Sequence, residues 1–143
     1  MYYEILAGEL LKINANLMQL PVSQQISRMV KGELFVLDYL SARGTAVHPK
    51  ELSKRLSVST ARIASLLNHM EEKRLIVRTE DPRDSRQVLV QLTQEGVKAI
   101  EENRRETISQ VSKMLESLGP DDAREYIRIQ RKIYGEYLKN HEQ

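Results

Sequence analysis

Apolar side chains recur at intervals of three and four residues over most of the chain, which is the repeat of a helix with one buried stripe. These stripes predict four helices, over residues 2–20, 32–42, 93–118 and 121–140. Residues 22–31 show no comparable stripe, and we expect a polar connector there, with Pro21 ending the first helix. The pattern therefore predicts a mainly α-helical protein.

The middle of the chain predicts two shorter helices joined by a tight turn. Pro49 suits the first turn of a helix over residues 49–56, and Ser57-Val58-Ser59 forms the turn. The second helix covers residues 59–73, and its buried stripe consists of Ile63, Leu66, Leu67 and Met70. The opposite side of this helix is small, polar and basic in its first half.

The pattern changes to that of β-strands between residues 75 and 92. Val88, Val90 and Leu92 fall on one face at period two, and Asp81-Pro82 is a strong turn signal upstream of them. We expect residues 45–47 to pair with this hairpin as a short third strand, and Thr93 to cap the helix that follows. A helix-turn-helix followed by a hairpin is a winged helix-turn-helix, here over about residues 32–96.

The composition excludes several classes of protein. The 143 residues suit one domain, and the absence of cysteine excludes disulfides, thiolate metal sites and a redox-sensing thiol. The three histidines lack the spacing of a metal site, and no nucleophile-and-base set occurs, so we expect no metal, no cofactor and no enzyme activity. No apolar run is long enough to span a membrane and the N-terminus has no basic leader, which predicts a cytoplasmic protein.

The charge distribution favours nucleic acid as a partner. The net charge is +2, but residues 45–94 contain nine Lys/Arg and six Asp/Glu, a surplus of three positive charges. Only the major groove distinguishes all four base pairs, and it admits an α-helix that has small residues and a few hydrogen-bond donors. The helix from residue 59 has these, which makes Thr60, Arg62, Ser65 and Asn68 candidate base-contacting residues, with Ser59 placed to hold a phosphate.

The tip of the hairpin carries the other candidates. Arg83 suits the narrow, electronegative minor groove of DNA. Arg86 suits either a phosphate contact or an internal pair with Asp84 that stiffens the tip. Asp81 and Asp84 are expected to orient the wing through local backbone bonds.

The string DPRDSR over residues 81–86, followed by VLVQLT and then by Gly96, resembles the wing signature of the MarR family of transcriptional regulators. The resemblance implies a homodimer that binds a palindromic operator on double-stranded DNA, mostly as a repressor. It also implies release of DNA by a small aromatic or anionic ligand. The resemblance further implies that the helix from Ser59 is the recognition helix and that Arg83 is the residue that enters the minor groove. Ser65 departs from the family, because many members have arginine there, and this leaves the operator sequence open.

The terminal helices have more apolar surface than one small winged domain covers, which predicts a homodimer. The expected dimerisation residues are Leu6, Leu10, Ile129, Ile133 and Tyr137. Two alternatives stay open: a winged helix that binds another protein, and a DNA-binding dimer that senses no ligand. The first would not need basic residues on both the recognition helix and the wing tip, and this chain has both.

Overall fold

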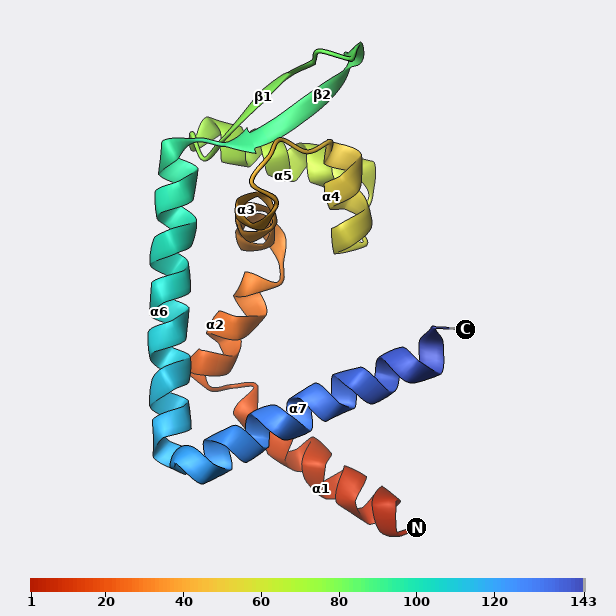
Figure 1. Cartoon of the computed structure of the whole chain (residues 1–143), viewed down its shortest axis with the longest axis vertical. Coiled ribbons are helices and arrows are strands. Elements are labelled where there is room, and N and C mark those ends of the chain that lie inside the picture. Colours follow the sequence, from red (N-terminus) through yellow and green to blue (C-terminus); the bar gives the residue numbers. More distant parts are fainter. Residues whose placement is uncertain (143) are drawn as a thin grey trace. The chain divides into compact units, whose positions relative to one another are not determined.

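The computed structural model describes residues 1–142 and consists of helices with one two-stranded sheet (Figure 1). Its contacts divide the chain into two units, residues 1–106 and the part from Thr107 onward. In chain order the elements are α1 (Tyr2–Leu17), α2 (Pro21–Met29), α3 (Gly32–Arg43), α4 (Pro49–Leu56), α5 (Thr60–Glu72), β1 (Ile76–Asp81), β2 (Asp84–Leu92), α6 (Gln94–Leu118) and α7 (Pro120–His141). The mainly α fold with a small β-wing is confirmed.

The core of the first unit lies where α3, α4, α5 and the hairpin meet. Its buried side chains come from each of these elements, from the residue Val47 between α3 and α4, and from α6: Val36, Leu37, Leu40, Val47, Leu52, Ile63, Leu67, Met70, Ile76, Val90 and Ile100. The apolar stripe predicted for the second helix of the pair is therefore the buried one. Gly44 ends α3 with a φ of 67°, a left-handed conformation that glycine adopts at little cost.

The polar connector expected over residues 22–31 is wrong, because most of it forms α2. Pro21 does not end the first helix, which stops at Leu17; it occupies the first turn of the next one. The inward-facing residue of α2 is Gln25, only 5% exposed, whose side chain accepts a hydrogen bond from Arg28 and donates one to Asn103 on α6. A helix that buries an amide lacks the apolar stripe by which helices are found in a sequence.

The hairpin is antiparallel, with Ile76 opposite Leu92 and Asp81 opposite Asp84. The expected third strand is reduced to one bridge, in which Val47 and Val90 exchange backbone hydrogen bonds of 2.9 and 2.8 Å. Coverage of the predicted apolar face falls toward the tip: Val90 is fully buried, whereas Val88 is 40% exposed. The outer part of the wing thus extends beyond the core.

Helix α6 begins at a side-chain cap and runs from the first unit into the second. Thr93 caps it as predicted, since its hydroxyl accepts a bond from the Gly96 N–H at 3.0 Å and donates one to the Arg74 carbonyl at 2.6 Å. Glycine is needed at position 96 because a Cβ there would lie 2.1 Å from the Leu75 carbonyl oxygen. This close approach fixes the start of α6 against Leu75, which lies between α5 and β1.

Candidate nucleic-acid interface

The helix-turn-helix consists of α4, a short turn and α5, and its turn is fixed by local bonds. Ser57 adopts a left-handed conformation with a φ of 54°, and the Ser53 hydroxyl donates to the Val58 carbonyl at 2.6 Å. Ser59 caps α5 by accepting a hydrogen bond from the Arg62 N–H at 3.1 Å. These bonds fix where α4 ends and α5 begins.

The face of α5 predicted to contact bases is exposed. Burial of Ile63, Leu67 and Met70 leaves the other side of the helix in solvent. The exposed residues include all five candidates: Ser59, Thr60, Arg62, Ser65 and Asn68. Their contact with DNA stays a prediction.

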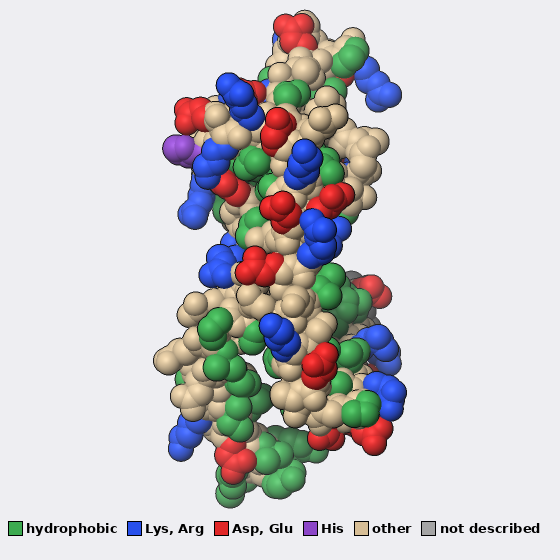
Figure 2. Space-filling view, turned by 90° about the vertical axis from the view of Figure 1, so that its left-hand side faces the viewer, with side chains coloured by type: hydrophobic (Ala, Val, Ile, Leu, Met, Phe, Trp, Pro, Cys, Tyr) green, Lys and Arg blue, Asp and Glu red, His purple; other side chains and the backbone are tan. Residues whose placement is uncertain are grey.

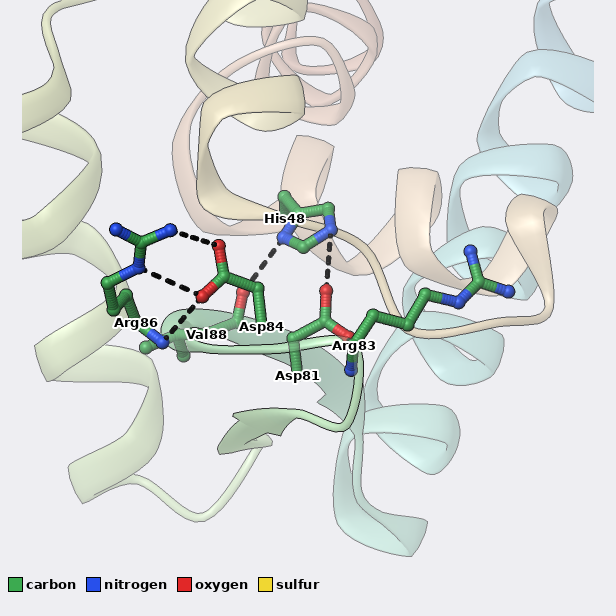
Figure 3. Close-up of polar contacts among 6 residues, drawn as sticks. All are labelled: His48, Asp81, Arg83, Asp84, Arg86 and Val88. Carbon is green, nitrogen blue, oxygen red and sulfur yellow. Dashed lines mark hydrogen bonds and ion pairs between the residues drawn. The ribbon is translucent and has the colours of Figure 1, made fainter.

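The wing tip is organised by two aspartates. Asp81 accepts a hydrogen bond from the Arg83 backbone N–H at 2.9 Å, and Asp84 accepts one from the Arg86 N–H at 3.1 Å. The Arg86 side chain also binds Asp84, with 3.2 Å between Nε and Oδ1, and these hydrogen bonds hold the pKa of the Asp84 carboxyl below its ordinary value. The Arg83 side chain instead extends away from the other labelled side chains (Figure 3).

His48 connects the wing tip to the beginning of α4, a contact that the sequence did not reveal. Its Nε2 lies 3.2 Å from Oδ2 of Asp81, and its Nδ1 lies 3.2 Å from the carbonyl oxygen of Val88 (Figure 3). Asp81 is only 8% exposed, so this carboxylate is satisfied from two sides, by the imidazole and by the Arg83 N–H. No sequence pattern indicates this role, because the partners of His48 lie more than thirty positions further along the chain.

A second unpredicted contact joins β1 to α5. Arg78 reaches from the hairpin to Asn68 and Glu71 on α5, at 2.6 Å from the amide oxygen and 3.0 Å from the carboxylate. The hydrogen bonds from Arg78 lower the pKa of the Glu71 carboxyl. No sequence pattern indicates this contact, because Arg78 and its partners belong to separate elements.

The candidate residues for DNA and for dimerisation occupy different parts of the chain. The α5 face and the wing tip both belong to residues 1–106. Of the dimerisation candidates, Leu6 and Leu10 lie on α1 in the same unit, while Ile129, Ile133 and Tyr137 lie on α7 in the second. Across residues 1–142, no three His, Asp or Glu side chains lie together as a metal site would require, and no helix has the length and hydrophobicity to cross a membrane.

Comparison with known proteins places these elements in a family. Residues 24–87, from α2 into β2, match the sequence profile of the MarR family. The chain is 26% identical over 83 residues to the uncharacterized HTH-type transcriptional regulator YdgJ of Bacillus subtilis. That match covers 58% of this chain and 51% of YdgJ, so it spans about half the length of the relative.

Two solved structures illustrate the likeness in fold. YusO of Bacillus subtilis superposes with a TM-score of 0.75 at 22% identity, over 94% of this chain and 98% of its own. MepR, a transcription regulator of the Staphylococcus aureus multidrug efflux pump MepA, gives a TM-score of 0.71 at 19% identity, over 91% and 97%. At these identities the superpositions establish a shared fold, and the family match rests on the sequence profile.

The ion pair between Arg86 and Asp84 at the wing tip can be tested by mutation. We expect Arg86→Met to raise the pKa of Asp84 toward its ordinary value, because the side-chain hydrogen bond that lowers it is lost. In the parent, the stabilisation from this pair is present above the ordinary carboxyl pKa and fades as the pH falls through the lowered one. An NMR titration of the Asp84 carboxyl measures the change. Arg83→Met is the matched control, since only the backbone of Arg83 bonds an aspartate; equal titration of Asp84 in parent and Arg86→Met would refute the pairing.

Proposed function

Because the chain belongs to the MarR family of transcriptional regulators, we propose that it binds double-stranded DNA as a homodimer and represses transcription from a palindromic operator. In this proposal the chain forms one MarR-like domain, with the winged helix-turn-helix over about residues 32–96. Helices within about residues 2–20 and 97–140 form the dimer.

The observation that carries the proposal is the joint exposure of the α5 face and of Arg83 in one structural unit. The α5 face supplies small side chains and donors, which suit the major groove. The wing extends past the core and ends in a cation, which suits the adjacent minor groove. A structure of a MepR variant, similar to this chain with a TM-score of 0.61, contains a bound oligodeoxyribonucleotide.

Selection of bound DNA from a random pool tests the proposal. We expect a palindrome whose half-sites lie roughly 10–10.5 base pairs apart, the spacing of two recognition helices in successive major grooves. Binding should weaken steeply as salt rises, because phosphate contacts release counterions. Absence of any enriched sequence, together with no gel shift at low salt, would favour the alternative of a protein-interaction module.

The wing is expected to contribute affinity more than base specificity. Arg83→Ala should weaken operator binding by roughly 1–3 kcal/mol, while the preferred major-groove sequence stays the same. Fluorescence anisotropy with labelled operator at two salt concentrations measures the loss. Equal affinity of the variant and the parent at moderate salt would show that the wing does not enter the groove as proposed.

The dimer is proposed from helices that bury nothing in the single chain. Neither α1 nor α7 has a buried residue, and Ile133 on α7 is 60% exposed. Figure 2 shows hydrophobic side chains at the surface among charges of both signs. Large apolar side chains exposed along one helix, as on α7, favour an interface.

We therefore expect Ile133→Asp to break the dimer and to abolish operator binding, although α7 is not among the proposed DNA-contacting elements. A buried aspartate at an apolar interface is costly. Sedimentation at micromolar concentration measures the oligomeric state. Lys132→Asp, which changes a neighbouring exposed position on the same helix, should remain dimeric; a parent that sediments as a monomer yet binds the palindrome tightly would contradict the proposal.

Ligand control is the last part of the proposal. A cavity of about 370 Å³ lies within the first unit, between the end of α3, residues 44–46, the end of β2 and Val97 on α6. Its size falls in the range of small-molecule sites. A structure of MepR, similar to this chain with a TM-score of 0.57, contains ethidium bromide.

We expect a millimolar aromatic acid such as salicylate to lower operator affinity and to raise the melting temperature of the free protein. A ligand that binds the folded state stabilises it by mass action. Differential scanning fluorimetry and gel shift measure the two effects. If a screen of aromatic acids and phenols changes neither quantity, the protein is a DNA-binding dimer without a sensor for this class of ligand.

A further inference from the structure

Arg78 holds one specific atom of Asn68, a residue on the proposed base-reading face. From β1 its guanidinium reaches α5, where Nη2 lies 2.6 Å from Oδ1 of Asn68 and 3.0 Å from Oε1 of Glu71. Its backbone N–H donates to Oε2 of the same glutamate at 3.2 Å, and its Nε lies 3.4 Å from that atom. Figure 1 shows the hairpin lying alongside α5, which allows the short reach.

The chemistry of arginine fixes which way the Asn68 amide points. Arginine has five N–H donors and no acceptor, so the amide atom that faces it must be the oxygen. The amide nitrogen and oxygen lie on opposite sides of the same carbon, and the NH₂ group is therefore turned away from Arg78. Glu71 keeps the guanidinium in place with two oxygens, a geometry that flexes less than a single contact.

We propose that Arg78 is a specificity-determining residue, because it makes Asn68 present only hydrogen-bond donors to DNA. This inference rests on the proposed function. A free asparagine reads adenine with both ends of its amide, accepting from N6 and donating to N7. Here the guanidinium occupies the oxygen and repels a second donor, while the NH₂ group remains able to donate.

The base that suits a donor-only amide is guanine, which presents two acceptors, N7 and O6, in the major groove. Adenine presents one acceptor beside a donor that would meet the NH₂ group or the guanidinium. At the position read by Asn68 the protein should therefore favour guanine over adenine. A purely structural clamp between β1 and α5 would instead change the affinity for all sequences alike.

The test compares base preferences selected from a random DNA pool by four full-length proteins. Asn68→Ala locates the position in each half-site that Asn68 reads. At that position the parent should prefer guanine, and Arg78→Met, which keeps the aliphatic stem, should move the preference toward adenine by on the order of fivefold or more. Arg105→Met, an exposed position on α6, is the control and should leave the preference unchanged.

A fourth variant keeps the inference testable if Arg78→Met fails to fold. Asn68→Asp retains an oxygen for Arg78 but has no donor, so guanine should no longer be favoured and cytosine, which presents the N4 donor, should be selected. The inference is overturned if the parent prefers adenine, if Arg78→Met selects the parent's sequence, or if Asn68→Asp still selects guanine. A parent that enriches no sequence at all refutes the proposed function instead.

Discussion

A two-stranded hairpin is at most marginally stable in water, so the wing has to be attached to the helices to keep a defined position. The structure attaches it at two levels. In the inner half of the hairpin, Arg78 and Val90 are opposite each other; Val90 is fully buried and pairs with Val47, and Arg78 binds α5. At the tip, His48 binds Asp81. The position of the outer cations follows from these contacts rather than from the hairpin itself.

These attachments also couple the two elements proposed to read DNA. Arg78 bonds α5 directly, and His48 is the residue that precedes α4. Both helices of the helix-turn-helix are therefore connected to the wing. A rigid connection reduces the ordering that binding would otherwise require. A hairpin and a helix that moved independently would lose conformational entropy when each became fixed in its groove of the DNA.

The sequence predicted the elements whose inward faces are apolar and missed what depends on polar burial or on distance along the chain. The ends of α4 matched the prediction, because proline and the apolar repeat mark them locally. Helix α2 was missed because it buries Gln25, and the single bridge at Val47 was overestimated as a strand. The contacts of His48 and Arg78 pair residues from separate elements, and no spacing rule connects such positions.

Charge balance on α5 shows why the missed contacts bear on DNA binding. Glu71 stands at the C-terminal end of a helix whose other end is proposed to approach phosphates, and an isolated carboxylate there would oppose that approach. Arg78 neutralises it at 3.0 Å. At the wing tip the pairing works the other way: Asp84 neutralises Arg86, whose side chain is 89% exposed, while Arg83 bonds an aspartate only through its backbone. Residues 81–86 contain two arginines and two aspartates, and Arg83 is the cation of the tip whose side chain extends away from both carboxylates in Figure 3.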